Sequence, residues 1–431
     1  MDKIINVLVF PCGAENAIEI HTALKNVVNI NLFGGSGKED HGSFIFKNYI
    51  GKIPYITESN FVDYLNDLIN KNNIDIIIPT HDDVSLFLAQ NQERIYAKIA
   101  VPGLNQAEIC RSKKTTYHLF KNEMFCPQVY NSDDPIDKFP LFVKPDKGQG
   151  GKGAFIVEDS GGLTNKKLKL QDEFVVTEYL PGEEITVDCF TDRHGILRFI
   201  GPRKRNRVFG GISVNSFTVP LSNEIETISN KINQKIKMRG LWFFQLKKDE
   251  LGKYKLLEIS VRTAGTMNLY RGLGVNFPLL TVYDMMDYDV EIIPNNYYLE
   301  VDRALFNRYK CNMDYDTIYI DFDDTITKKG KVNPFVLLFL YNAKNNNKFI
   351  KLITRHESDL YSTLNKLAIH PSLFNSIIHI KPDEEKYRII SEKSKVIFID
   401  NSFKERLKVK KNLDIPVFDV DAIDTLIDWR E

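Results

Sequence analysis

Apolar and polar positions along the first hundred residues follow two different periods. Continuous apolar runs predict buried strands at residues 4–10, 28–33 and 74–79. Apolar positions spaced by three or four predict amphipathic helices at residues 14–25, 61–69 and 84–95. Strands that alternate with helices in this order form parallel, doubly wound sheets. We therefore expect a Rossmann-like α/β domain over residues 1–110.

The pattern changes twice along the rest of the chain. A helix predicted at residues 106–121 precedes strand-rich sequence, so we expect an α+β domain over residues 111–298, followed by a linker at 299–314. Strand and helix then alternate again, which predicts a third domain, with a parallel sheet, over residues 315–431. Its expected strands are 317–322, 349–354, 376–380, 396–400 and 417–420.

Composition limits the classes of function. A chain of 431 residues exceeds the size of one hydrophobic core, and its 43% apolar and 26% charged residues exclude a mostly disordered protein. The 57 basic and 57 acidic residues cancel, so no global charge attracts nucleic acid or anionic membranes. Five separated cysteines without a CxxC pair indicate neither a disulfide framework nor structural zinc. With neither a signal peptide nor a membrane-spanning run in the sequence, we expect a cytoplasmic protein.

A glycine-rich segment carries the first candidate chemistry. A predicted strand ends at Lys144 and leads into Asp146-Lys-Gly-Gln-Gly-Gly-Lys152-Gly153. Glycines let backbone N–H groups approach a phosphate, and the flanking lysines add positive charge. No GK[ST] follows, so this is not a Walker A loop. A solvated hairpin turn is the alternative interpretation of the loop taken by itself.

Residues downstream favour a nucleotide site. Glu178-Tyr-Leu-Pro-Gly-Glu-Glu184 links two predicted strands, and two further strands carry Gln245 and Glu258 near their ends. Amide and carboxylate oxygens are hard ligands that suit Mg²⁺ on nucleotide phosphates. Arg262 follows in the segment Glu-Ile-Ser-Val-Arg.

These motifs resemble the ATP-grasp superfamily, especially carboxylate–amine ligases related to the large chain of carbamoyl phosphate synthase. The resemblance covers residues 1–292 and implies ATP and Mg²⁺ as cofactors, with Mn²⁺ as a substitute. It implies that phosphates are bound by Lys113, Lys144 and Lys152, adenine and ribose by Glu178, Tyr179, Leu180 and Glu184, and metal by Gln245 and Glu258. Arg262 would stabilise the transferring phosphoryl group.

The implied reaction proceeds through an acyl phosphate. A carboxylate attacks the γ-phosphate of ATP, and an amine then displaces phosphate. Arg203 and Arg207 are candidates for holding the substrate carboxylate, because guanidinium binds carboxylates bidentately; a solvated basic turn is the alternative. Two positions depart from the family pattern. Ser260 stands where the usual motif has asparagine, and Ser112 precedes Lys113 where related sequences often carry an acid.

A second cluster of polar residues follows the strands of the C-terminal domain. The apolar strand ending at Ile320 runs into Asp321-Phe-Asp323-Asp-Thr325, and later strands end at Thr354 and Asp400. Carboxyl ends of parallel strands meet at one edge of a sheet, where active sites form. An acidic turn that caps a helix is the alternative interpretation.

This arrangement resembles the haloacid dehalogenase (HAD) phosphatase superfamily. The resemblance implies that Asp321 is the nucleophile and Asp323 the general acid and base, while Thr354 and Lys386 bind phosphoryl oxygens and Lys381 is the rival lysine. The implied metal ligands are Asp321, Asp323 and Asp400. The position after Asp400 is Asn401, where the family often has an acid. Short spacings between the motifs predict a site without a cap domain.

The leading expectation is therefore a multidomain α/β bifunctional enzyme: an ATP-grasp ligase joining a carboxylate to an amine, fused to a capless HAD-like phosphatase acting on a phosphomonoester. Its expected partners are small molecules, with no nucleic acid and no membrane, and a homo-oligomer is compatible with the sequence. Two alternatives remain: an ATP-grasp small-molecule kinase, and a nucleotide-binding protein with a decayed ligase site. His81 and His356 are further candidates at strand ends, although His81 fits a loop histidine better.

Overall fold

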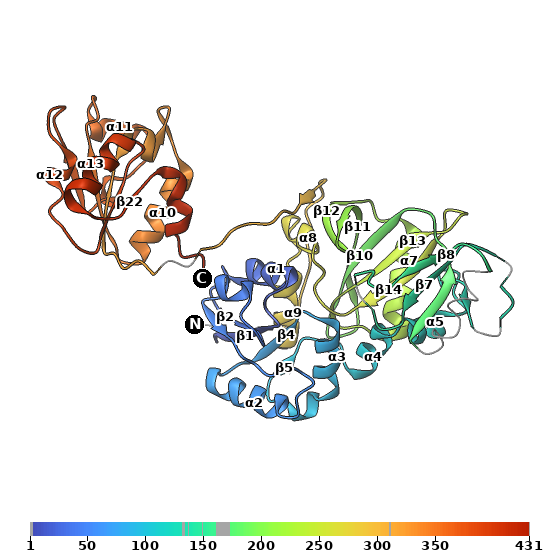
Figure 1. Cartoon of the computed structure of the whole chain (residues 1–431). Coiled ribbons are helices and arrows are strands. Elements are labelled where there is room, and N and C mark those ends of the chain that lie inside the picture. The colour runs from blue at the N-terminus through green and yellow to red at the C-terminus, as the bar shows by residue number, and fades with distance from the viewer. Residues whose placement is uncertain are drawn as a thin grey trace. The chain divides into compact units, whose positions relative to one another are not determined.

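The computed structural model describes residues 3–131, 134–136, 138–148, 150–160, 173–309 and 312–430 (Figure 1). The chain divides into two compact units, residues 1–305 and 306–431, called here the first and second unit. Gln149 of the glycine-rich segment and Cys311 lie outside the described residues.

The first unit opens with a parallel five-stranded sheet in the order β3-β2-β1-β4-β5. Its strands are β1 (Ile5–Phe10), β2 (Ile30–Gly35), β3 (Asn48–Ile50), β4 (Ile76–Pro79) and β5 (Lys98–Ile99). The helices are α1 (Glu15–Leu24), α2 (Phe61–Asn72), α3 (Asp82–Gln90) and α4 (Leu104–Arg111), with short 3₁₀ turns η1 (His41–Phe44) and η2 (Gln92–Arg94). The pattern of apolar runs predicted β1, β2 and β4. It did not predict the two short edge strands, β3 and β5.

The predicted helix at residues 106–121 is two helices. α4 ends at Arg111, and α5 (Lys113–Phe120) begins after Ser112, whose backbone is extended. The Ser112 hydroxyl accepts a hydrogen bond from the N–H of Thr115, which makes it the N-cap of α5. This break places Lys113 in the first turn of a new helix.

Two antiparallel sheets follow. The smaller, in the order β6-β9-β7-β8, contains β6 (Val129–Tyr130), β7 (Leu141–Pro145), β8 (Phe155–Val157) and β9 (Phe174–Glu178). The larger, in the order β14-β13-β10-β11-β12-β15, contains β10 (Glu184–Thr191), β11 (Leu197–Phe209), β12 (Ile212–Thr218), β13 (Gly240–Lys248), β14 (Tyr254–Ser260) and β15 (Glu300–Asp302). The helices are α7 (Asn223–Ile236), α8 (Asn268–Gly272) and α9 (Phe277–Met285).

Three features of this region depart from the sequence expectation. The amphipathic helix α7 interrupts the strand-rich stretch, and its buried isoleucines join the core of the larger sheet. β15 pairs with β12 and so occupies part of the segment expected to be a linker. Val282 and Met285 of α9 belong to the same core as α1, so the chain returns to the first sheet after leaving it.

The second unit is built on a parallel sheet in the order β20-β19-β16-β21-β22. Its strands are β16 (Thr317–Ile320), β19 (Phe349–Thr354), β20 (Ser376–His379), β21 (Val396–Ile399) and β22 (Val417–Phe418). A hairpin of β17 (Thr327–Lys328) and β18 (Lys331–Val332) follows the helical turn η4 (Phe322–Ile326). The remaining helices are α10 (Pro334–Asn345), α11 (Leu360–Lys366), α12 (Lys386–Ile389) and α13 (Phe403–Leu413), with 3₁₀ segments η5 (Pro371–Leu373) and η6 (Val420–Leu426).

Burial on both faces explains why these strands are continuous apolar runs. All four residues of β16 and of β21 are buried, and both strands contribute to apolar cores of the second unit. Across the described residues, no helix combines the length and the apolar character needed to cross a membrane.

Candidate functional site

The start of α5 and the glycine-rich segment are tied together by one carboxylate. Asp146 accepts hydrogen bonds from the Ser112 hydroxyl at 2.9 and 3.0 Å and from the N–H of Lys114 at 2.7 Å. An acid at this place stabilises the positive end of a helix. The serine that departs from the family pattern is therefore part of an N-terminal cap.

Two lysines converge beside this cap. Lys113 Nζ donates to the carbonyl oxygens of Asp146 and Gly148 at 3.3 and 3.1 Å, and it lies 3.8 Å from a carboxylate oxygen of Glu258. Lys144 Nζ donates to the Tyr117 hydroxyl at 2.6 Å and to the Leu257 carbonyl at 3.2 Å. Burial and then the charge of Lys113 lower the pKa of Lys144 to about 7. Such a lysine favours an incoming anion.

The predicted magnesium ligands face each other on neighbouring strands. Gln245 of β13 lies opposite Glu258 of β14 in the antiparallel register. With its amide oriented to suit its neighbours, Gln245 donates to Glu258 Oε1 at 3.3 Å and accepts from Arg205 at 3.2 Å. Arg205 also contacts Glu184 at 2.5 Å, so one guanidinium joins a predicted metal ligand to a predicted ribose ligand. Arg205 precedes Gly210-Gly211 in the sequence, as Arg203 and Arg207 do, but the resemblance assigned it no ligand.

The hairpin of β11 and β12 contacts the glycine-rich segment. A Cβ atom added to Gly211, at the hairpin tip, would lie 2.1 Å from the carbonyl oxygen of Gly150. Gly211 has a φ of +80°, and its carbonyl accepts a hydrogen bond from Arg205 at 3.0 Å. Lys152 is exposed on the same glycine-rich segment. The contact requires glycine at the tip because any side chain would collide with the backbone of the segment.

The predicted adenine-binding segment follows β9. The Glu178 carboxylate accepts from the N–H of Gln128 at 2.9 Å, and the backbone of Glu178 returns a hydrogen bond to the Gln128 carbonyl at 3.0 Å. Leu180 is buried, and the ammonium of Lys247 lies 5.8 Å from the centre of the Tyr179 ring. This segment connects the smaller sheet to β10, which starts at Glu184.

Arg262 is held by a residue from the first sheet. Asp82, the first residue of α3, accepts from Arg262 Nε at 3.0 Å and from the Ser260 hydroxyl at 2.7 Å. Burial opposes ionisation of Asp82, but Arg262, Ser260 and Arg111 outweigh it and lower its pKa. After the end of β4, the residue that contacts the predicted site is therefore Asp82. The ring of the preceding His81 instead accepts a hydrogen bond from the N–H of Asp83.

The two arginines predicted to bind a substrate carboxylate lie in different surroundings. Arg203 is 2% exposed; its guanidinium donates to both oxygens of the buried Asp188, at 2.6 and 3.1 Å, and to Thr266 at 2.7 Å. Arg207 is exposed and pairs with Asp302 at 2.7 Å. Because its donors bind buried partners inside the protein, we leave Arg203 out of the proposed substrate contacts.

Three predicted residues of the second unit meet at the carboxyl ends of its strands. Lys386 Nζ lies between two carboxylates, donating to Asp321 at 2.6 Å and to Asp400 at 2.7 Å. All three residues are buried. Burial raises the pKa of Asp321 although Lys386 opposes the shift. The lysine in contact with the acids is Lys386, whereas its predicted rival Lys381 is exposed.

Asp323 contacts a histidine. Both of its carboxylate oxygens lie 3.0 Å from His356 Nδ1, and His356 Nε2 lies 3.0 Å from the Thr363 hydroxyl. The buried Thr354 hydroxyl accepts from the N–H of His356 at 3.2 Å. Asn401, which stands where related sequences often have an acid, accepts from the Thr325 hydroxyl at 3.2 Å.

The predicted metal sites differ in how well these residues fit a divalent cation. Among the described residues, no three His, Cys, Asp or Glu side chains are arranged to hold a metal. Asp321 and Asp400 nevertheless converge on one cation, the ammonium of Lys386, so their chemistry fits Mg²⁺. The Asp323 side chain contacts His356 instead, so we leave it out of the proposed metal ligands. Glu258 offers a carboxylate oxygen, whereas the Gln245 oxygen accepts from Arg205 and would reach a metal only after the amide turns; with both oxygens in place the pair would fit a metal that is also bound by phosphates.

Comparison with known proteins identifies the first unit's fold. Residues 171–303 match the family described as ATP-grasp in the biosynthetic pathway with Ter operon. A phosphoribosylamine–glycine ligase from Clostridium acetobutylicum is 27% identical over 236 residues, which are 46% of this chain and 56% of that protein. The chain thus spans little more than half the length of this curated relative.

Solved structures give the same result. The biotin carboxylase domain of Hydrogenobacter thermophilus 2-oxoglutarate carboxylase, in complex with MgADP, ADP and bicarbonate, superposes with a TM-score of 0.57 at 15% identity, covering 70% of this chain and 74% of that one. An L-amino acid ligase from Bacillus licheniformis gives a TM-score of 0.52 at 16% identity, covering 66% and 75%. The chain is therefore a mixed α/β protein that contains an ATP-grasp-like fold.

Proposed function

We propose that the first unit is an ATP-dependent carboxylate–amine ligase that works through an acyl phosphate. The observation that carries this proposal is the cluster of Lys113 and Lys144 beside Glu258 and Gln245, next to the glycine-rich segment. A buried lysine with a pKa near 7 lacks a full counter-charge, and nucleotide phosphates supply one. The match to ATP-grasp proteins supports the same assignment.

The residues would act mainly by position and charge. Lys113 and Lys144 would bind the phosphates, and the glycine-rich segment with Lys152 would cover them. Mg²⁺ held by Gln245 and Glu258 would neutralise charge on the phosphate oxygens. Arg262, fixed by Asp82, would face the oxygens of the transferring group. In phosphoryl transfer to a carboxylate the protein forms no covalent bond itself. Its main contribution is therefore to place these charges around the transferring group.

ADP formation tests the ligase proposal. A panel of carboxylates and amines should reveal a pair that supports ADP release only when both are present, and mass spectrometry should identify the amide. Glu258→Ala should slow that reaction at least about a hundredfold, whereas Glu250→Ala, at an exposed turn, should leave it unchanged. ADP release without an amine would favour a small-molecule kinase. Nucleotide binding with no turnover on any pair would favour a decayed site.

We propose, as a second activity, that the second unit hydrolyses phosphomonoesters. The observation that favours it is the placement of Lys386 between Asp321 and Asp400 at the ends of parallel strands. Asp321 would attack the phosphorus and form an aspartyl phosphate while the alcohol leaves. Asp323 would protonate the leaving oxygen and then take a proton from the water that hydrolyses the intermediate. Thr354 and Lys386 would hold the phosphoryl oxygens, and Mg²⁺ bound by Asp321 and Asp400 would neutralise them.

An aryl phosphate tests this second activity. Asp321→Asn should abolish magnesium-dependent hydrolysis while leaving ADP formation by the first unit intact. Asp421→Asn, at an exposed acid of the same unit, is the matched control. Unchanged hydrolysis in Asp321→Asn would rule out the aspartyl phosphate.

The two activities together suggest an order of reaction. We propose that the amine carries a phosphate used for recognition, which the second unit removes after ligation. The intact protein should then release phosphate from the amide product faster than from the free phosphorylated amine. Equal rates on the two compounds would contradict this order.

A further inference from the structure

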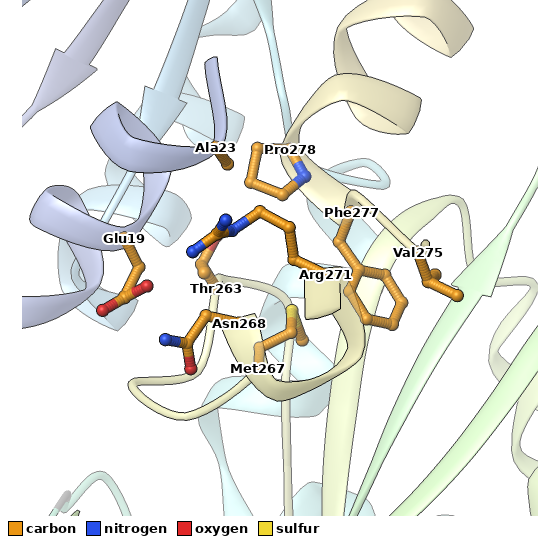
Figure 2. A pocket seen from close by; sticks show the side chains of 9 residues that line it. All are labelled: Glu19, Ala23, Thr263, Met267, Asn268, Arg271, Val275, Phe277 and Pro278. Atoms are coloured by element: carbon orange, nitrogen blue, oxygen red, sulfur yellow. The ribbon is translucent and has the colours of Figure 1, made fainter. Parts of the chain in front are cut away.

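A hollow in the first unit is too small to hold a substrate. Figure 2 shows the side chains around it, which include the polar residues Glu19, Thr263, Asn268 and Arg271. The space admits about one water molecule, which suffices to pair the buried polar atoms of these residues. The contacts around Asp323 in the second unit, by contrast, bear on the chemistry of a proposed reaction.

The imidazole of His356 is held in place by several elements of the second unit. His356 lies in the turn between β19 and α11, where its N–H donates to the Thr354 hydroxyl at 3.2 Å and its carbonyl oxygen lies 2.6 Å from His379 Nε2. Its ring packs edge to face on Phe322, with the ring centres 5.2 Å apart. These contacts fix the position of the ring independently of Asp323.

The hydrogen bonds of Thr363 determine which nitrogen of the ring carries a hydrogen. The Thr363 hydroxyl donates its single proton to the Asp359 carbonyl at 3.0 Å, so toward His356 Nε2, also at 3.0 Å, it acts as an acceptor. Nε2 therefore carries a hydrogen, and Nδ1 faces both carboxylate oxygens of Asp323 at 3.0 Å. Whichever of the two groups holds the proton between them, a hydrogen bond joins the ring to the carboxyl group.

Asp323 depends on this hydrogen bond for a fixed orientation. Its side chain is 54% exposed, whereas that of His356 is 14% exposed. Among the residues that the structure describes, the His356 ring alone hydrogen-bonds to the Asp323 carboxylate. A general acid contributes only when its proton points at the leaving oxygen, so an exposed carboxyl group that turns freely would act poorly.

We propose that His356 is a positioning residue for the phosphatase reaction, which holds the Asp323 carboxyl group in the orientation needed for its two proton transfers. One Asp323 oxygen keeps the hydrogen bond to Nδ1, and the other faces the leaving oxygen. As Asp321 bonds to phosphorus and the P–O bond to the alcohol breaks, Asp323 gives its proton to the departing oxygen. When water attacks the aspartyl phosphate and releases Asp321, Asp323 takes a proton from that water. This role rests on the proposed phosphatase function.

The proposal also indicates the class of substrate. Esters of aliphatic alcohols need the proton, because an alkoxide is a poor leaving group, whereas an activated aryl ester such as p-nitrophenyl phosphate departs as its anion. A held general acid therefore favours an aliphatic phosphomonoester as the substrate of the second unit.

The comparison of two esters tests the role of His356 in the intact protein. The quantity to measure is kcat/KM, which reports the steps up to departure of the leaving group. His356→Phe retains a ring against Phe322 and removes both nitrogens. It should lower kcat/KM for glycerol 2-phosphate about tenfold or more, and for p-nitrophenyl phosphate less than about threefold. Asp323→Asn should divide the two esters in the same way.

Two further variants separate positioning from damage to the fold. His356→Asn keeps an N–H donor close to the position of Nδ1 and should recover much of the loss on glycerol 2-phosphate. His370→Phe, which replaces an exposed histidine of the same unit, should leave both rates unchanged.

The outcomes distinguish this role from the phosphatase proposal itself. Equal losses on the two esters, no loss on either, or His356→Asn as slow as His356→Phe would overturn the role of His356 while Asp321-dependent hydrolysis stands. If the unaltered protein hydrolyses neither ester, or if Asp321→Asn hydrolyses both at the full rate, the phosphatase proposal falls and the role of His356 falls with it.

Discussion

Lys144 allows a quantitative test of the nucleotide site. With a pKa of about 7, this lysine carries a proton in only about one tenth of the ligand-free molecules at pH 8. Nucleotide phosphates beside it favour the charged form, because opposite charges raise the pKa of a lysine. Binding of a magnesium–nucleotide analogue at pH 8 should therefore take up about 0.9 proton per protein.

Calorimetry measures this proton directly. The binding enthalpy of a non-hydrolysable ATP analogue, measured at pH 8 in HEPES and in Tris, differs by the number of protons taken up times the difference in buffer ionisation enthalpy. Lys144→Met should reduce the uptake to near zero. Lys231→Met, which changes an exposed lysine of α7, should retain it. No uptake in the unaltered protein, or full uptake in Lys144→Met, would refute the assignment of Lys144 to the phosphate site.

The same pKa of Lys144 predicts how the free energy of unfolding of the nucleotide-free protein changes with pH. Between pH 7 and 10.5 the unfolded chain holds the Lys144 proton and the folded protein has released it, so the free energy of unfolding rises with pH over this window. The gain from pH 7 to pH 9 is about 2 kcal/mol, out of a total of about 5 kcal/mol for the full shift. Urea unfolding of the first unit, followed by the buried Trp242 in a Trp429→Phe background, should show this slope, and Lys144→Met should remove it.

Two further predictions concern single contacts. Gly211→Ala should raise the KM for ATP several-fold, because the new methyl group collides with the Gly150 carbonyl. Gly210 also has a positive φ, but a Cβ atom there meets no neighbour, so Gly210→Ala should have a much smaller effect. Steady-state kinetics of both variants measure the difference. Arg203→Met should lower the free energy of unfolding by about 3–5 kcal/mol, because it leaves the Asp188 carboxylate buried and unpaired. The double variant with Asp188→Leu should recover most of that loss in urea unfolding. A double variant whose loss equals the sum of the two single losses would contradict this.

The periodicity of apolar residues was enough to predict most of the elements that position both sites. The strand at 349–354 coincides with β19, and the helix at 14–25 exceeds α1 by one residue at each end. The short strands β3 and β5 escaped prediction because two or three residues carry no period. The break at Ser112 escaped prediction because the hydrogen bonds that fix it come from Asp146, far along the chain.

Contacts between distant segments explain what the sequence could not show of the sites. Arg203 has the spacing of a basic turn, yet its partner Asp188 lies on the neighbouring strand and both side chains point into the protein. Asp82 reaches Arg262 across 180 positions in the sequence. Strand-end motifs, by contrast, could predict that Asp321 and Asp400 meet, because parallel strands bring their carboxyl ends to one edge.

The guanidinium of Arg205 has a consequence for how this protein can change in evolution. It binds Glu184, Gln245 and the Gly211 carbonyl at once. Replacing one partner therefore changes how the guanidinium holds the other two. We expect Arg205, Glu184 and Gln245 to be conserved or replaced together. Homologues that replace the arginine should also differ at Glu184 or Gln245, and an alignment in which these three positions vary independently would show that the guanidinium does not couple them.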